Sequence, residues 1–236
     1  MTSPLLPPPG LPDTRVTRLI VDGGNHAIEW DTLEVVKRYT NAFVINEHSS
    51  EILLGFKKRG FGVNKYNGFG GKVEPNETAM EAARRELKEE AGIDAPLEHC
   101  GTLLFKSVGF AYAHHIDIYR AAKLVRRNYR VSDTLNTSIP SYFVARLTRA
   151  RIDPTKCAPS GSRPRSIPNC TVPTPVNGIP YDDMWQDDRM WLPLLLANTK
   201  FVGRVDFGAS PSGDPTAADG PMVKWWFAEV STLNEM

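Results

Sequence analysis

The sequence predicts an α/β fold, because segments typical of strands alternate along the chain with segments typical of helices. An apolar run at residues 51–56 and a run at residues 115–119 predict strands. Helix-forming residues between a capping signal and a glycine predict a helix at residues 78–92. An amphipathic segment around Trp191 predicts a second helix, with Pro193 in or near its first turn.

The composition describes an ordinary soluble protein. Its 236 residues fit one domain with extensions, or at most two domains. A net charge of +1 with 23% charged residues gives no bulk attraction for nucleic acid or an anionic membrane, and no apolar run approaches the ~18 residues that span a bilayer. Three cysteines without a CxxC pair predict neither a disulfide framework nor a zinc site. We therefore expect a reducing compartment, the cytoplasm.

The first thirty residues are expected to form a proline-rich, disordered N-terminal extension. The opening MTSPLLPPPG is rich in proline and lacks the charged start and apolar core of a secretion signal. An organelle-targeting role stays open, which leaves the nucleus and the mitochondrion as alternative locations. Residues 15–30 carry no clear signal, so order is expected to begin near Tyr39.

Two strands at residues 42–45 and 51–56 are expected to be joined by a turn at residues 46–50. The following segment 57–62, KKRGFG, is a basic loop. Such loops are commonly only solvated, but one beside a carboxylate-metal site would suit a polyphosphate. Further along, His114 and His115 are adjacent on a predicted strand, so they face opposite sides and form no metal pair.

The helix at residues 78–92 carries an acidic stripe. Thr78 and Glu81 form a capping box at its start, and Gly92 can end it in a left-handed conformation. Like charges at helical spacing cost roughly 0.2–0.5 kcal/mol per pair, which a hard cation such as Mg²⁺ would offset. An acidic stripe is usually only a solvated face, however. Three glutamates share this stripe: Glu86, Glu89 and Glu90.

The wider pattern resembles the signature of the Nudix hydrolase family. It reads Gly71, five residues, Glu77, seven residues, Arg85-Glu86-Leu87, one residue, Glu89-Glu90, one residue, Gly92-Ile93. The resemblance implies an α/β/α sandwich with a mixed sheet, and hydrolysis of a nucleoside diphosphate linked to another moiety. It also implies Mg²⁺, or Mn²⁺ in its place, held by the Gly70 carbonyl, Glu86, Glu89 and Glu90.

The same resemblance implies roles in catalysis. One of the three glutamates would be the general base, and the sequence does not say which. Arg85 would orient Glu89 or Glu90 rather than touch the substrate. Lys57 and Lys72 are candidates for contact with the phosphates.

Four further strings narrow the resemblance to one subgroup, the mammalian MutT homologues, which hydrolyse oxidised purine nucleoside triphosphates. They are LLGFKKRGFG (53–62), NGFGGKVEP (67–75), DMWQDDRMWLPLLL (183–196) and KFVGRVDF (200–207). In that subgroup the purine lies between aromatic and polar side chains. The positions that carry over are Thr40, Phe61, Asn67, Trp185, Asp187 and Asp188.

The aspartate pair has a physical reason to read a base. Two neighbouring carboxyls do not both ionise easily, so one can stay protonated and donate a hydrogen bond while the other accepts. A pair able to exchange these roles could take both 8-oxoguanine and 2-hydroxyadenine. The alternative is that Asp187 and Asp188 merely cap the following helix, and the two interpretations are compatible.

The resemblance covers roughly residues 39–119 and 179–230, so the expected Nudix domain at residues 31–230 is interrupted. Residues 126–177 hold seven prolines, nine Arg or Lys, two Asp and no Glu, with a strand signal only at residues 142–144. The family's acidic segment and tryptophan-bearing strand are missing there. The interval is either a basic insertion or translated intron in a faulty gene model. We favour the second, because a replaced core strand is hard to tolerate.

The sequence therefore predicts a monomeric, Mg²⁺-dependent hydrolase of oxidised purine nucleoside triphosphates, among them 8-oxo-dGTP and 2-hydroxy-dATP. Its products would be the monophosphate and pyrophosphate, and its role nucleotide-pool sanitation and prevention of DNA damage. The expected partner is a small-molecule nucleotide, not nucleic acid or membrane. Three alternatives stay open: a Nudix hydrolase of another nucleoside diphosphate derivative, a non-catalytic nucleotide- or RNA-binding module, and a chain that does not fold stably.

Overall fold

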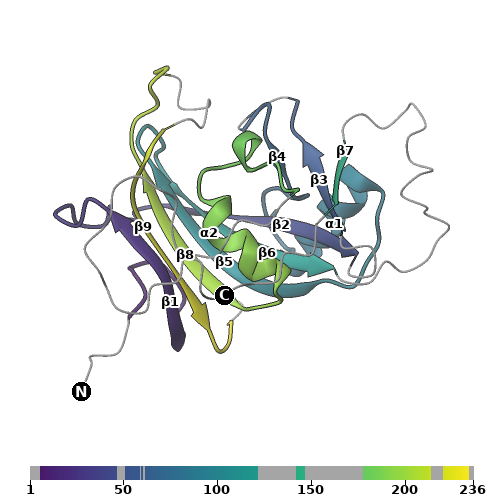
Figure 1. Ribbon diagram of the computed structural model, residues 1–236, viewed down its shortest axis with the longest axis horizontal. Helices are drawn as coiled ribbons and strands as arrows, with labels where there is room; N and C mark the ends of the chain where they lie inside the picture. Colours follow the sequence, from purple (N-terminus) through teal and green to yellow (C-terminus); the bar gives the residue numbers. More distant parts are fainter. Residues whose placement is uncertain are drawn as a thin grey trace.

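One mixed sheet forms the centre of the protein in the computed structural model, which describes residues 6–46, 51–58, 60, 62–121, 142–146, 178–213 and 220–233 (Figure 1). The described strands are β1 (Val16–Gly24), β2 (Val36–Asn46), β3 (Glu51–Phe56), β4 (Tyr66–Asn67), β5 (Glu98–Ser107), β6 (Ala113–Ala121), β7 (Tyr142–Arg146), β8 (Phe201–Phe207) and β9 (Met222–Val230). The helices are α1 (Ala79–Ala91), the 3₁₀ turn η1 (Tyr181–Asp183) and α2 (Asp188–Leu196).

The strand order is β1-β9-β8-β5-β6-β2-β3-β4, with β7 also paired to β3. Strands β2 and β6 run parallel, as do β5 and β8, whereas the other pairs are antiparallel. In Figure 1, α2 lies in front of this sheet and α1 lies toward its β2–β3 end. The mixed sheet was predicted, and it is confirmed.

Alternation along β2 divides the core into two layers. Phe43 and Ile45 belong to the cluster that contains Trp191 of α2, whereas Ala42 and Val44 belong to the cluster that contains Leu87 of α1. Successive side chains of a strand point to opposite faces, so the two helices cover opposite faces of the sheet. The expected α/β/α sandwich is therefore confirmed.

Helix α1 begins and ends where the sequence predicts. The Thr78 hydroxyl accepts from the Glu81 N–H at 3.2 Å, and the Glu81 carboxylate accepts from the Thr78 N–H at 2.8 Å. Gly92 ends the helix with φ of 67°, in the left-handed region. Small residues at Ala82 and Ala83 are buried, which lets the helix lie close to the sheet.

Helix α2 differs from the prediction at Pro193. The helix starts at Asp188, so Pro193 lies inside it rather than in its first turn. The proline removes the backbone N–H that would bond to the carbonyl four residues earlier. Burial of Trp191, Leu192 and Leu195 against the sheet offsets that loss.

The N-terminal segment is part of the sheet, which the expectation of disorder over residues 1–30 did not foresee. Strand β1 pairs with β9, and Ile20 is fully buried. The guanidinium of Arg204, 0% exposed, donates to the carbonyls of Pro9 and Asp31 at 2.7 Å each. Residues on both sides of β1 are thus tied to β8. The domain boundary at residue 30 stays a prediction.

Within the basic interval, the structure places β7 on the edge of β3, in agreement with the strand signal at residues 142–144. The rest of residues 126–177 lies outside the described residues, so the insertion and the gene-model explanation both stay predictions. In the described part of the chain, no helix has the length and apolar character needed to cross a membrane.

Candidate active site

The glycine loop lies directly against the acidic stripe of α1. The Gly70 N–H donates to Glu90 Oε2 at 3.0 Å. A Cβ added to Gly71 would lie 2.3 Å from Glu86 Oε1, so any other residue here would push the Glu86 carboxylate away from the loop. The Gly71 carbonyl also accepts from the Thr40 N–H at 2.8 Å, which fixes the loop to β2. Glu86 and Glu90 are therefore held beside a rigid backbone.

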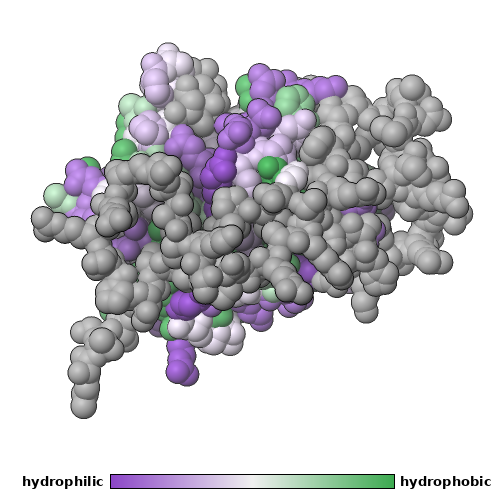
Figure 2. Space-filling view, viewed as in Figure 1, coloured by the Kyte–Doolittle hydropathy of each residue, from purple (hydrophilic) through white to green (hydrophobic). Residues whose placement is uncertain are grey.

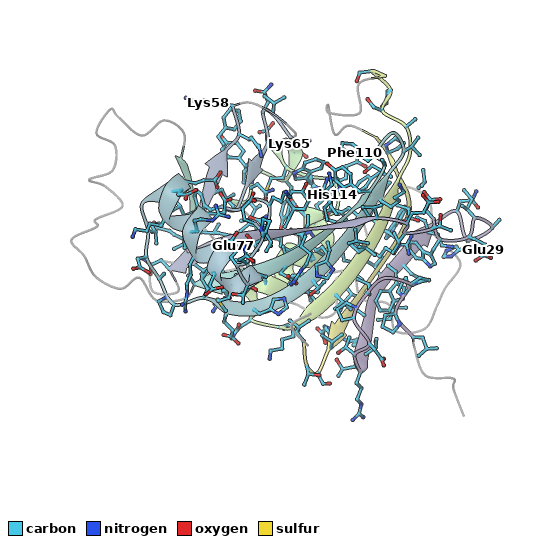
Figure 3. The ribbon with its side chains drawn as sticks, turned by 180° about the vertical axis from the view of Figure 1, so that it is seen from behind. Glu29, Lys58, Lys65, Glu77, Phe110 and His114 are labelled. Carbon is cyan, nitrogen blue, oxygen red and sulfur yellow. The ribbon has the colours of Figure 1, made fainter. Side chains whose placement is uncertain are left out.

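Arg85 connects the remaining carboxylates. It donates to both oxygens of Glu77 at 2.8 and 3.1 Å, to Glu86 at 2.8 Å and to Glu89 at 3.4 Å. These bonds hold the pKa of Glu77 below its usual value. Arg85, which was expected to orient Glu89 or Glu90, thus contacts Glu86 and Glu89. Glu90 is held by the Gly70 N–H instead. In Figure 3, Glu77 lies at the α1 side of the sheet.

The environment of Glu90 favours a cation. Removal from water raises the pKa of this carboxyl, and the nearby charges of Glu86 and Glu89 raise it further. The Gly70 N–H and the charge of Lys57 act in the opposite direction, which places Lys57 close to the site. Lys72 is exposed, and its carbonyl accepts from Arg85 at 3.3 Å.

The donor set fits a hard divalent ion by its chemistry, since it consists of carboxylate and carbonyl oxygens. Among the described residues, however, no three acidic, histidine or cysteine side chains converge on one position. Arg85 holds oxygens of Glu86 and Glu89, which explains this arrangement.

A second acidic group lies at the start of α2, on the other face of the sheet. Asp187 and Asp188 are only 1% and 2% exposed. Asp187 accepts from the Trp191 indole N–H at 2.9 Å, and Asp188 accepts from the Trp185 backbone N–H at 3.1 Å. Asp187 occupies the N-cap position but makes no side-chain capping bond. The capping interpretation therefore does not apply to it.

This aspartate pair is built to carry a proton. Burial raises the pKa of Asp187 to about 6, and burial together with the Asp187 charge raises the pKa of Asp188 well above its usual value. In the described part of the chain, Asp187 Oδ1 is buried without a hydrogen-bond partner. The pair can thus offer a neutral carboxyl as a donor beside an acceptor oxygen.

Trp185 lies between the aspartate pair and the basic loop. A Cβ on Gly62 would lie 2.8 Å from the Trp185 ring, and Lys65 Nζ is 5.5 Å from the ring centroid. Lys65 also donates to the Met184 carbonyl at 3.1 Å. Phe61, predicted to line the same pocket, lies outside the described residues. The sequence analysis identified the basic loop at residues 57–62, which contains Lys58. Lys65 lies beyond that loop and was not identified.

Asn67 ends β4 and contacts a residue that the sequence analysis missed. Its Oδ1 accepts from the Gly68 N–H at 2.8 Å and from Asn41 Nδ2 at 2.7 Å. Asn41 lies in the middle of β2, where asparagine has a low propensity. That unfavourable residue was a signal for a specific role. Figure 2 shows mainly hydrophilic residues over the ends of β3 and β4.

Thr40 does not join this group. It is the neighbour of Asn41 on β2, so its side chain points to the opposite face, the face of Ala42 and α1. It is 3% exposed, and its hydroxyl has no hydrogen-bond partner among the described residues. The expectation that Thr40 lines the base pocket stays a prediction. Asn41, its neighbour on β2, faces the α2 side.

The two histidines of β6 are structural, as expected. His114 stacks on Tyr39 with ring centroids 5.2 Å apart, and burial lowers its pKa to about 4. His115 Nε2 lies 3.1 Å from Asp117 on the other face. Figure 3 shows His114 beside Phe110, whose ring centroid is 5.3 Å away.

Both halves of the site meet in the segment 67–71. Asn67 contacts Asn41 on the α2 face, whereas Gly70 and Gly71 contact the glutamates of α1. On the α2 face, Phe43 follows Asn41 and packs edge-on against Trp191, with centroids 5.6 Å apart. Trp191 in turn holds Asp187. An acidic, glycine-bound centre is therefore connected through this segment to a group of amides, an indole and a buried carboxyl pair.

Comparison with known proteins agrees with this geometry. A protein-family model described as NUDIX domain matches residues 36–128, the span that contains β2 to β6 and α1. An oxidized purine nucleoside triphosphate hydrolase of Danio rerio is 33% identical over 158 residues, which cover 66% of this chain and 78% of that protein. The chain belongs to the Nudix family. It is a Nudix hydrolase, an enzyme class that generally uses divalent metal ions and acts on small-molecule nucleotides.

One further sequence relative and one solved structure are also similar to this Nudix hydrolase. An oxidized purine nucleoside triphosphate hydrolase of Mus musculus is 32% identical over 170 residues, which cover 72% of this chain and 85% of that protein. A MutT protein of Bacillus halodurans, known from its crystal structure, has 16% sequence identity and a TM-score of 0.45. Its match covers 81% of this chain and 97% of that one.

Proposed function

We propose that this Nudix enzyme hydrolyses oxidised purine nucleoside triphosphates, including 8-oxo-dGTP and 2-hydroxy-dATP, to the monophosphate and pyrophosphate. The observation that carries the proposal is the buried pair Asp187 and Asp188, whose raised pKa values keep a proton available near neutrality. The names of the Danio rerio and Mus musculus relatives support the same substrate class. The cellular role is sanitation of the nucleotide pool, which prevents DNA damage.

Recognition of the base rests on the α2 face. Trp185 stacks on the purine, and the two aspartates read its edge, one as a donor and one as an acceptor. Asp187 Oδ1, buried without a partner among described residues, gains one when the base binds. Sites built to hydrogen-bond their substrate can reject an analogue lacking those groups by as much as ~10⁴-fold, so this arrangement can separate oxidised from normal purines.

Hydrolysis rests on the opposite face. Glu86, Glu89, Glu90 and the Gly70 carbonyl would hold Mg²⁺, or Mn²⁺, which when bound neutralises phosphate charge and acidifies water. Arg85 positions Glu86 and Glu89, and one of the three glutamates accepts the proton of the attacking water. Lys57 and Lys72 contact the phosphates, and the effect of Lys57 on the pKa of Glu90 supports its nearness.

We also infer a monomer that works in the cytoplasm, with the nuclear and mitochondrial pools as alternatives. The catalytic domain spans residues 31–230 around the interval 126–177. The pairing of β1 with β9 argues that residues 16–24 are part of the same folding unit.

The test is pyrophosphate release by the purified 236-residue protein with Mg²⁺, comparing 8-oxo-dGTP, 2-hydroxy-dATP and dGTP. Faster turnover of the two oxidised substrates supports the proposal. Equal turnover of dGTP, or turnover only of other nucleoside diphosphate derivatives, contradicts it. Binding of nucleotide without any turnover would instead indicate a non-catalytic module.

A further inference from the structure

The turn that precedes β4 holds Lys65 in a fixed place. The Lys65 N–H donates to the Gly62 carbonyl at 3.2 Å, and the Lys65 carbonyl accepts from the Lys57 N–H at 3.0 Å. The neighbouring Asn64, whose φ is 65°, donates its N–H to the Lys57 carbonyl at 2.8 Å. Both backbone polar groups of Lys65 are therefore bonded, and its half-buried side chain extends from a well-defined turn.

The ammonium group of Lys65 contacts the segment 184–188, which leads into α2. Its Nζ donates to the carbonyl of Met184, a residue that is 2% exposed, at 3.1 Å. The same Nζ lies 5.5 Å from the centroid of the Trp185 ring, within the range of cation–π attraction. A hydrogen bond from a charged donor is stronger than one between neutral groups. Lys65 therefore anchors this segment immediately before Trp185.

A neutral side chain anchors the same segment from the other side. The Gln186 amide donates to the Gly220 carbonyl and accepts from the Met222 N–H, each at 3.4 Å, at the start of β9. Trp185 thus lies between two anchors that come from distant parts of the chain. Lys65 brings a positive charge to the segment, whereas Gln186 brings none.

The charge of Lys65 also acts on the buried aspartate pair. Burial raises the pKa of both Asp187 and Asp188, and the charge of Lys65 acts in the opposite direction on each. Two neighbouring carboxyls removed from water both favour the neutral form unless an opposite charge lies nearby. A cation beside this segment therefore favours one ionised carboxylate next to one protonated carboxyl.

The other charged groups around the pair are exposed or bonded to one another. On η1, Asp182 and Asp183 are exposed, and Arg189 of α2 donates to Asp182 at 2.6 Å. On the sheet side, the contacts of the pair lead to uncharged aromatic rings, those of Trp191, Phe43 and Phe201. Among the described residues, the counter-charge for the pair therefore comes from Lys65.

We infer that Lys65 is a positioning residue, whose ammonium group anchors the segment before α2 and keeps a single proton on the aspartate pair. This role rests on the proposed function and deepens it. A pair with one proton offers one donor and one acceptor, whereas a pair with two protons has lost its charged acceptor. Lys65 would thus act on specificity through the aspartates, without touching the base.

The proton on the pair is measured without any nucleotide. Carbon-13 NMR of aspartate-labelled protein follows the carboxyls of the pair as pH changes. In Lys65→Met, the lower apparent pKa of the pair should rise by about one pH unit, because a nearby positive charge is lost. Lys65→Arg, which keeps the charge, and Gln186→Met, which removes the neutral anchor, should leave it unchanged. An unchanged titration in Lys65→Met would overturn the inference, whatever the enzyme hydrolyses.

Kinetics then connect the proton to specificity. The measured quantity is the ratio of kcat/KM for 8-oxo-dGTP to that for dGTP, in which pH effects shared by both substrates cancel. With the pKa of Asp187 at about 6, a rise to about 7 lowers the singly ionised fraction about threefold at pH 6.5 and little at pH 8.5. The ratio for Lys65→Met should fall in the same way.

The variant Gln186→Met is the matched control, because it loosens the same segment without removing a charge. Any change that it causes in the ratio should be equal at pH 6.5 and pH 8.5. An equal fall at both pH values in Lys65→Met as well would show that Lys65 is a structural anchor only, and would overturn the inference. Absence of turnover by the unmodified protein would contradict the proposed function alone, since the carboxyl titration does not depend on turnover.

Discussion

The acidic groups on the two faces of the sheet use the same functional group in opposite ways. The glutamates of α1 are partly exposed and paired with Arg85 or a loop N–H, so they remain able to attract a cation. Asp187 and Asp188 are buried, and burial raises the pKa of both. Burial and partners, rather than residue type, therefore set the pKa of each carboxyl, which is the basis for proposing metal binding on one face and base recognition on the other.

The largest expected effect on activity comes from neutralising one glutamate of the exposed stripe on α1. Glu90→Gln should lower pyrophosphate release on the order of 10³-fold, because it removes a carboxylate from the metal and water site, while stability changes little. The matched control is Glu29→Gln, whose side chain Figure 3 places at the far end of the molecule from Glu77. Activity retained in Glu90→Gln would show that this carboxylate is not part of the catalytic centre.

A change in the buried aspartate pair should instead alter the free energy of unfolding and its dependence on pH. A carboxyl whose folded pKa is raised from 3.8 to about 6 stabilises the fold below pH 4, and that contribution is lost as pH rises through 6. Asp187→Asn keeps an acceptor for Trp191 and removes the charge. At pH 7.5 it should raise the free energy of unfolding by about 3 kcal/mol, with little change at pH 4.

Urea unfolding at the two pH values measures this. An Asp182→Asn variant is the control, since Asp182 is exposed and forms a surface pair with Arg189. A gain in Asp187→Asn that is equal at both pH values would mean that the buried pair carries no proton.

A third variant separates base binding from catalysis. Trp185→Ala should raise KM for 8-oxo-dGTP about tenfold or more, the cost of losing one stacking platform, with a smaller change in kcat. Steady-state kinetics of pyrophosphate release measure both constants. An equal fall in kcat with KM unchanged would place the indole on the catalytic side rather than the base side.

The smallest effect is expected at Thr40, and it tests the assignment of faces. Thr40→Val preserves shape and removes a buried hydroxyl without a partner among described residues, so stability should stay equal or rise by up to about 1 kcal/mol. The ratio of kcat/KM for 8-oxo-dGTP and dGTP should not change. A changed ratio would indicate that Thr40 contacts the base.

Local signals explain why α1 was predicted to the residue. Thr78, Glu81 and Gly92 act within one helix, so their spacing alone specifies where it begins and ends. Strand β1 lacks such a signal. Its pairing with β9 joins distant parts of the chain and contains two register shifts, which disturb the alternation that marks a strand.

The residues of the candidate site also divide into those predictable from local spacing and those that depend on contacts between distant elements. The glutamates follow from their spacing on one helix, whereas Asn41 and Lys65 act through contacts with residues from other elements. The face of Thr40 could not be predicted from its motif, because a strand changes face at every residue and a shift of one position moves a side chain to the other layer. Resemblance to a family identifies a candidate residue on β2, but the register of β2 in the sheet determines which face that side chain lies on.

The closing of the sheet by β1 and β9 has a consequence for synthesis on the ribosome. Helix α1 contains its own start and stop signals and can form as soon as it emerges. Strand β1 must wait for a partner about 200 residues later, which at about 5–20 residues per second takes on the order of 10–40 s. Throughout that interval the nascent chain presents β1 without the strand that pairs with it in the folded protein.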